Sequence, residues 1–326
     1  DIGAYLHAEY VQAISDTKAA LALQINNAMA IADFSDPSNV TFTYTPINNK
    51  VFGADDRALI YDEDETDPTQ KVMRAFPGLE MTRAPDGMAT YTYPSGDTYV
   101  FTANEGAGHQ VAFWMQDDGA WMWKFEDADI AKIGDVPALA ALKTQLALHD
   151  DTRVLPASTQ GAYSFGSDGK VVMNGSRDAM AFKVNADNTL TEAGNTGHSI
   201  DQYHYDELQE TPVHLSVSYA VGRLLKKGAE PAGVAVGLVG EKVVLFVCLE
   251  RTDHIQAFDV TNPTVSIYQP IQEYTFNVPN DGTIQYNKPE GIKFLDAEKT
   301  AGGKYPQVIV SLEKGSFVYV KDIIPQ

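Results

Sequence analysis

The chain has 326 residues, of which 44% are hydrophobic, and its 24 basic and 44 acidic side chains leave a formal net charge of −20 at pH 7. This hydrophobic content suits a folded globular core, whereas the excess of negative charge disfavours nucleic acid and anionic membrane surfaces as partners and favours cations. No run of about 18 apolar residues occurs, so the sequence predicts no membrane-spanning helix.

The first part of the chain predicts a small sheet and then an acidic loop. In residues 8–34 the SDTK turn joins two alternating or apolar strands. Residues 35–80 hold one more predicted strand and the acidic segment YDEDETDP. Its Asp62, Asp64 and Asp67 form an oxygen-rich cluster of the kind that binds Ca²⁺, although the glycine and the distal glutamate of an EF-hand loop are missing. A solvated acidic loop is the alternative.

The middle of the chain repeats the strand pattern and adds a helix. Residues 84–114 resemble the opening repeat, and 161–184 form a weaker copy. Between them, apolar residues at helical spacing predict one inserted helix near 136–149. We interpret HSIDQYHYDELQE, residues 198–210, as a polar edge strand on which two histidines and an aspartate share one face, a conceivable transition-metal site.

The clearest copy of the repeat spans residues 229–260 and predicts an antiparallel sheet of about three strands. The last copy spans 288–323. Repetition of a short sheet is typical of a β-propeller, so we expect an all-β propeller of about five blades, forming one domain over residues 1–326. Cys248 lies in an apolar strand and is predicted to fill a core position.

Acidic residues recur at two positions of the repeat, and we predict a metal site there. The position before the first strand holds Glu9, Asp86, Ala232 and Glu290, with Glu230 only two residues from the alanine. The position after the next apolar strand holds Gln24, Glu105, Asn174, Glu250 and Glu313. Equivalent positions of successive blades form rings, so these carboxylates should converge and attract a hard cation such as Ca²⁺. Capping of each turn by its own acid, or a catalytic carboxylate pair, are the alternatives.

Several segments together resemble the choice-of-anchor I family, related to the mesenchyme-specific cell-surface glycoprotein of biomineralising cells. They are EPAGVAVG (230–237), FVCLERTDHIQAFDVTNP (246–263), PDGMATY (85–91), GDTYVFTANEG (96–106) and KPEGIKFL (288–295). The resemblance implies a secreted or surface-anchored β-propeller, a loose association with alkaline phosphatase, and a link in animals to calcium-carbonate mineral. The family's acid in the Pro-Glu-Gly turn is Ala232 here, and Ala107 replaces another expected acid, which puts an inherited metal site in doubt.

The resemblance also implies that the family domain begins earlier than this chain. We therefore expect a seven-bladed ring whose N-terminal blades come from another chain or fragment, and a five-bladed ring that closes by itself is the alternative. The predicted function is a non-catalytic, extracellular or cell-surface propeller that binds Ca²⁺ and acts as a scaffold or contacts matrix or mineral. The sequons at Asn39 and Asn174 suit a secreted glycoprotein. A calcium-dependent phosphoesterase, or a purely structural subunit of a larger assembly, are the alternative functions.

Overall fold

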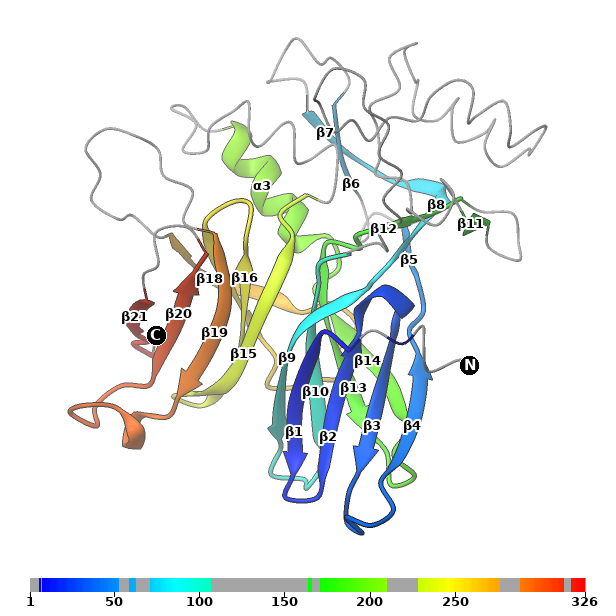
Figure 1. Ribbon diagram of the computed structural model, residues 1–326. Helices are drawn as coiled ribbons and strands as arrows, with labels where there is room; N and C mark the ends of the chain where they lie inside the picture. Colours follow the sequence, from blue (N-terminus) through cyan, green and yellow to red (C-terminus); the bar gives the residue numbers. More distant parts are fainter. Residues whose placement is uncertain are drawn as a thin grey trace.

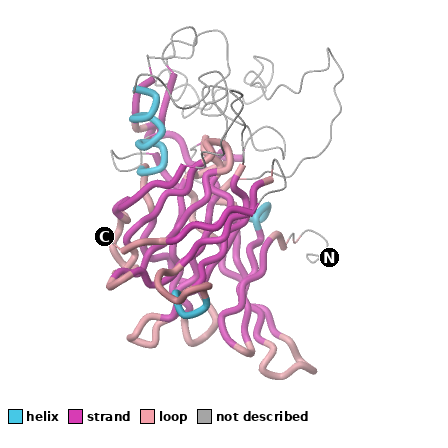
Figure 2. Tube along the Cα trace, turned by 90° about the vertical axis from the view of Figure 1, so that its left-hand side faces the viewer, coloured by secondary structure: helices cyan, strands magenta, loops and turns pink. Residues whose placement is uncertain are grey.

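The computed structural model describes residues 6, 8–52, 59–62, 71–106, 164–165, 171–209, 228–275, 288–313 and 318–325. Within these residues the chain is built mainly of antiparallel β-sheets that pack face to face (Figure 1). Figure 2 shows their strands running between the end of the molecule that carries the helix α3 and the opposite end. Among the described helices, none has the length and apolar character needed to cross a membrane.

The first blade is a four-stranded antiparallel meander in the order β1-β2-β3-β4. Its strands are β1 (Tyr10–Ser15), β2 (Lys18–Leu23), β3 (Ala28–Asp33) and β4 (Thr41–Pro46). Two residues, Asp16 and Thr17, separate β1 from β2, as the SDTK turn predicted.

The second blade unites two copies of the predicted repeat. Its strands are β9 (Pro85–Thr92), β10 (Thr98–Asn104), β13 (Asp178–Val184) and β14 (Leu190–Asn195). β13 pairs with β10 from Asp178 to Lys183, so the weaker copy at 161–184 supplies the third strand of this blade instead of forming a blade of its own. The segment between β10 and β13 is therefore an insertion within one blade.

The third blade contains β15 (Pro231–Val239), β16 (Lys242–Leu249), β17 (His254–Asp259) and β18 (Gln269–Thr275). The fourth contains β19 (Pro289–Leu295), β20 (Gln307–Leu312) and β21 (Val318–Asp322), and its described part has three strands. The described residues thus form a β-propeller arrangement with four blades. The expected count of about five is not confirmed, because two of the predicted copies share one sheet.

Smaller elements lie at one end of the blades (Figure 1). A mixed sheet has the order β11-β12-β8-β5, and β6 pairs with β7. Their bounds are β5 (Lys50–Phe52), β6 (Leu59–Asp62), β7 (Lys71–Arg74), β8 (Phe76–Thr82), β11 (Ser164–Phe165) and β12 (Val171–Asn174). In the part of the chain that the structure describes, single 3₁₀ turns occur at Gln24–Asn26 and Ala297–Lys299.

The segment predicted as a polar edge strand is the helix α3 (Ser199–Gln209), so that prediction was wrong. Ile200, Tyr203 and His204 are buried on one face, at the i, i+3, i+4 spacing of a helix. Asp201 in the first turn complements the helix dipole. The other predicted helix, near 136–149, lies outside the described residues.

The hydrophobic core lies between successive blades and not inside any one of them. Met29 and Ile31 of the first blade pack against Val100 and Phe182 of the second. Phe101 of the second blade belongs to a cluster with third-blade residues such as Leu245 and Phe258, and the opposite face of the third blade packs on the fourth. Cys248 is fully buried in this last cluster, which confirms its predicted core position.

Glycines let the first strands of neighbouring blades approach closely. A Cβ atom on Gly87 of β9 would lie 2.4 Å from the carbonyl oxygen of Ala232 in β15. One on Gly233 of β15 would lie 2.2 Å from the carbonyl oxygen of Glu290 in β19. The repeated Pro-x-Gly motif therefore reflects backbone packing between blades, where no side chain fits.

Candidate functional site

The recurring acids converge at one end of the blades. β9, β15 and β19 begin at this end, whereas β10, β16 and β20 finish at it, because the strands are antiparallel neighbours (Figure 1). The structure brings together acids that precede or begin the first strands with acids that follow the second strands. The group, called the axial carboxylate cluster below, comprises Glu9, Asp86, Glu105, Glu230, Glu250, Glu290 and Glu313.

Two triads within the cluster have oxygens close enough to share one ion. One oxygen from each of Glu105, Glu230 and Glu250 lies within 4.8 Å of the others, and the same holds for Glu250, Glu290 and Glu313. Glu230 and Glu250 are buried, whereas Glu290 and Glu313 are exposed. The cluster therefore extends from buried carboxyl groups to carboxyl groups that are exposed to solvent.

Glu230 belongs to the cluster although the predicted ligand set omits it. It directly precedes β15, has a φ of 52° and is fully buried. The position that the repeat assigned to this blade is Ala232, which is also buried but carries no ligand atom. The sequence could have indicated Glu230 as a ligand, because it is an acid two residues before Ala232.

Basic side chains neutralise part of the cluster. Arg251 lies 2.9 Å from Glu230 Oε2 through Nε and 2.7 Å from Glu250 Oε1 through Nη1. Lys288 lies 3.1 Å from Glu250 Oε1 and 2.5 Å from Glu313 Oε2. Gln24 donates from Nε2 to Glu105 Oε2 at 2.9 Å. The seven named carboxyl groups thus outnumber these two cations.

The uncompensated charge changes the acidity of several carboxyl groups. Burial raises the pKa of Asp86 to about 8, with further contributions from Glu105, Glu290, Glu9 and Glu250. Burial also raises the pKa of Glu250 to about 7, against the opposing effect of Arg251. The hydrogen bond from Lys288 lowers the pKa of Glu313. Asp86 therefore holds a proton at neutral pH, as expected where carboxylates crowd without enough cations.

The cluster meets the first requirements of a Ca²⁺ site. Ca²⁺ binds six to eight oxygens at about 2.3–2.6 Å, so two ligands of one ion lie at most about 5 Å apart. The 4.8 Å limit within each triad satisfies this condition. The donors are hard carboxylate oxygens, as Ca²⁺ prefers. Arg251 and Lys288 occupy some of the same oxygens and would compete with an ion.

The other predicted acidic site lies mostly outside the described residues. Asp62 ends β6, but the structure describes only its backbone, and Asp64 and Asp67 lie outside the described residues.

The histidines of α3 do not form the conceivable transition-metal site of an edge strand, since the segment is helical. His204 is fully buried, and its Nε2 lies 2.9 Å from Thr252 Oγ1. Burial lowers the pKa of His204 to about 3, with help from His254 and Arg177, so its imidazole is neutral. Asp206 accepts a hydrogen bond from Gln202 one helical turn earlier.

A second buried polar group, centred on Asp178, lies at the beginning of β13. Asp178 forms an ion pair with Arg83 and accepts hydrogen bonds from Asn104 at 2.7 Å and Ser176 at 2.5 Å. Lys50 Nζ donates to the carbonyl oxygens of Ser176 and Gly197. These bonds satisfy the buried charges and connect the second blade to β5, which indicates a structural role.

Comparison with solved structures finds proteins of low similarity. A candidate 6-phosphogluconolactonase from Bacteroides fragilis shares 12% identity over 98% of this chain and 70% of its own, with a TM-score of 0.28. A catalytically inactive virginiamycin B lyase from Staphylococcus aureus shares 10% identity over 98% of this chain and 85% of its own, with a TM-score of 0.23. The Cps50 (Swd1) β-propeller domain of Myceliophteria thermophila shares 9% identity over 94% of this chain and 80% of its own, with a TM-score of 0.25. Scores this low support no argument, and the fold assignment rests on the sheet topology.

Comparison with curated proteins gave no match. Comparison with protein-family models matched the choice-of-anchor I domain over residues 2–263. This match spans the first two blades and the strands β15, β16 and β17 of the third, which is most of the chain, and it includes the acids from Glu9 to Glu250. The chain therefore belongs to the choice-of-anchor I domain family.

Proposed function

We propose that this protein is a non-catalytic, surface-associated β-propeller that binds Ca²⁺ at the axial carboxylate cluster and serves as a scaffold or a contact with matrix or mineral. The observation that carries the proposal is the convergence of Glu105, Glu230 and Glu250, from two blades, on a volume that one ion can fill. A bound cation would connect the blades.

The charge balance at the cluster favours a divalent cation over turn capping alone. Glu250 forms an ion pair with Lys288 across the boundary between the third and fourth blades, whereas a turn cap would bond within its own turn. Asp86, with its pKa raised to about 8, is a ligand that is protonated without metal. Binding of Ca²⁺ would displace this proton and relieve the repulsion.

Placement at the cell surface or outside the cell is supported by the family and by one exposed sequon. Asn39 lies in the exposed turn between β3 and β4, where a glycan would meet no obstruction. The net charge of −20 suits contact with calcium-rich material. The sequence resemblance to the mesenchyme-specific cell-surface glycoprotein is the reason to extend the same proposal to biomineral surfaces.

A partner that supplies further blades is part of this proposal. Val11 of β1, and Phe42 and Tyr44 of β4, lie on the face of the first blade opposite to Met29 and Ile31, and all three are exposed. Gly291 repeats the Pro-x-Gly motif, yet among the described residues a Cβ there would meet only the Ser311 side chain within 4 Å. Both features fit the packing of additional blades, as in a larger ring.

The test is calcium titration by calorimetry, with melting temperature recorded in Ca²⁺ and in chelator. A ligand that binds only the folded state stabilises it by about 2.7 kcal/mol at a hundredfold excess over its Kd. We expect heat of binding and a rise of several degrees in Ca²⁺ for the parent protein. Glu105→Gln should lose most of the rise, whereas Glu298→Gln, an exposed acid in the second 3₁₀ turn, should keep it.

If Ca²⁺ gives no heat of binding and does not change the melting temperature, the proposed calcium site is contradicted. The acids would then serve only as surface charge. A phosphoesterase remains the alternative outcome. Turnover of a simple phosphate ester that is lost in chelator and in Glu290→Gln would contradict the non-catalytic part of the proposal.

A further inference from the structure

The helix α3 is anchored beside the buried acids of the axial carboxylate cluster. Its Asp201 lies 3.5 Å from Nη1 of Arg177, and both side chains are almost fully buried. Nε2 of its His204 lies 2.9 Å from Oγ1 of Thr252, two residues after Glu250. α3 therefore contacts the same end of the blades as the cluster (Figure 1).

Arg177 connects α3 electrostatically with Glu230. It packs against Gly228, two residues before Glu230, so closely that a Cβ on this glycine would lie 2.9 Å from the arginine Cδ and Nε atoms. Burial lowers the pKa of the Arg177 guanidinium, and the carboxylates of Asp201 and Glu230 oppose this shift because both stabilise its positive charge. The guanidinium thus interacts with one acid on α3 and with one acid of the cluster.

The segments that carry the two buried acids of the cluster are bonded to each other. Glu250 donates its backbone N–H to the Glu230 carbonyl oxygen at 3.1 Å. The Tyr203 ring of α3 packs edge-on against His254, four residues after Glu250, with ring centroids 5.1 Å apart. Docking of α3 on these segments therefore brings the charge of Asp201 close to the cluster.

A cation at Glu230 changes how strongly Asp201 is attracted to its site. Without a cation, Glu230 shares Arg177 with Asp201, and the two carboxylates repel each other. A cation at Glu230 offsets this negative charge, so that Arg177 and the cation both attract Asp201. The three side chains are at most 1% exposed, so water screens these interactions little. Docking of α3 and binding of a cation therefore favour each other.

We propose that Arg177 couples the docking of α3 to the charge at Glu230, so that a cation in the axial carboxylate cluster holds the helix more tightly. The identity of this cation, Ca²⁺, rests on the proposed function. Arg177 and Asp201 are positioning residues of that site, since neither needs to touch the ion. The stability of the helix then depends on whether the site is occupied.

The test combines amide hydrogen exchange of α3 with calorimetry. In the parent protein we expect saturating Ca²⁺ to slow exchange of the α3 amides about tenfold, relative to its effect on β3 in the first blade. Asp201→Asn should lose this gain, and its Kd for Ca²⁺ should rise by about the same factor, because coupling between two sites is reciprocal. Asp206→Asn, which removes an exposed charge from the same helix, should keep both values within about twofold of the parent protein.

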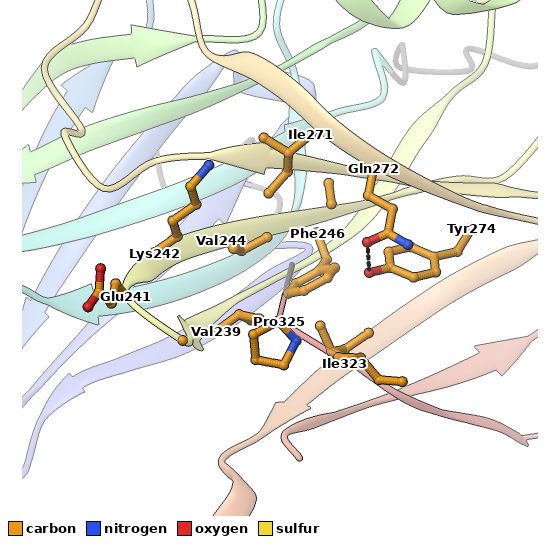
Figure 3. Close-up of a pocket in the computed structure, with 13 residues that line it drawn as sticks. Val239, Glu241, Lys242, Val244, Phe246, Ile271, Gln272, Tyr274, Ile323 and Pro325 are labelled. Atoms are coloured by element: carbon orange, nitrogen blue, oxygen red, sulfur yellow. Dashed lines mark hydrogen bonds between the residues drawn. The ribbon is translucent and has the colours of Figure 1, made fainter.

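A metal-free comparison tests the connection through Arg177 by itself. Glu230→Gln removes the charge that a cation would offset, so in chelator it should slow exchange of the α3 amides, as Ca²⁺ does in the parent protein. Glu241→Gln is the matched control, because Glu241 is exposed in the turn at the other end of the β15–β16 hairpin. It lines a cavity of about 390 Å³ between the third and fourth blades (Figure 3), and its substitution should leave α3 exchange unchanged.

The outcomes separate this coupling from the calcium site. If Ca²⁺ binds but changes neither the α3 exchange nor the Kd of Asp201→Asn relative to the parent protein, the coupling is overturned and the calcium site stands. If Ca²⁺ does not bind, the calcium site is overturned, and Glu230→Gln decides the coupling. Unchanged α3 exchange in this variant then overturns the coupling, whereas slower exchange supports it. The comparison of the parent protein with and without Ca²⁺ needs no variant, so it remains decisive if Asp201→Asn does not fold.

Discussion

Lys288, directly before β19 in the fourth blade, lies 3.1 Å from the Oε1 atom of Glu250, which follows β16 in the third blade. Arg251 binds the same oxygen at 2.7 Å. The protein thus places its own cations in the axial carboxylate cluster, where they connect two blades and reduce the repulsion between acids. These cations stabilise the metal-free protein and weaken the binding of an external ion.

Removal of Lys288 should therefore tighten calcium binding. In Lys288→Gln we expect the Kd for Ca²⁺ to fall about tenfold, which corresponds to about 1.4 kcal/mol. The metal-free variant should melt below the parent protein, because Glu250 and Glu313 lose their partner. Calorimetry and melting curves in chelator measure both effects. Lys293→Gln, an exposed site on the same strand, is the control, and equal affinities in all three proteins would contradict the proposed competition.

Asp86 should make the metal-free protein less stable as pH rises. Its pKa is about 8 in the folded state and 3.8 ordinarily, so the folded state holds a proton that the unfolded state loses between these values. Stability from this group is therefore complete below about pH 4 and is lost as pH rises to about 8. In Asp86→Asn we expect a gain of about 1–3 kcal/mol at pH 8 in chelator, after allowance for solvent screening.

The gain in Asp86→Asn should vanish near pH 4, and unfolding in urea at both pH values measures it. Saturating Ca²⁺ should reverse the order at pH 8, since the parent protein keeps a ligand that the variant lacks. A pH-independent difference between the two proteins would show that the effect of the substitution is not electrostatic.

The repeat could be predicted from the sequence because apolar strand residues and turn residues recur in the same order in each copy. Apolar strands such as Val243–Leu249 and the Pro-x-Gly motifs predicted the strands and their order, and the recurring acids marked the end of the blades where they gather. The blade count was less predictable, since β10 and β13 pair across a long insertion. No local pattern shows which of two distant strands will be neighbours.

The left-handed backbone position before the first strand of a blade could not be predicted, because a different residue type occupies it in each blade. The residue before the first strand has a positive φ in three blades, at Ala84, Glu230 and Lys288. Three unrelated side chains at one left-handed position give no motif. The helix α3 was missed for another reason: its buried face includes His204, whose polar character concealed the helical pattern.

The glycines of the Pro-x-Gly motif should differ in their tolerance of alanine. A Cβ on Gly233 would lie 2.2 Å from the Glu290 carbonyl oxygen, so the backbones of two blades must move apart. On Gly291 the nearest atom is Ser311 Oγ at 2.7 Å, and this side chain can rotate. We expect Gly233→Ala to lose about 1–3 kcal/mol of unfolding free energy and Gly291→Ala less than about 0.5. Equal losses in urea unfolding would contradict close packing of the strands as the cause.

The buried imidazole of His204 should make the protein sensitive to acid. Its pKa is about 3 in the folded state against an ordinary 6.5, so the unfolded state binds a proton first as pH falls. Stability is complete above about pH 6.5 and is lost as pH falls toward 3, at up to about 1.4 kcal/mol per pH unit. His204→Gln can still reach Thr252 but does not titrate, so its stability should fall less steeply between pH 6 and 4 than that of the parent protein. Unfolding in urea across this range measures the slope, and His198→Gln, at a partly exposed position, is the control. If all three proteins share one slope, protonation of His204 is not the origin of the acid sensitivity.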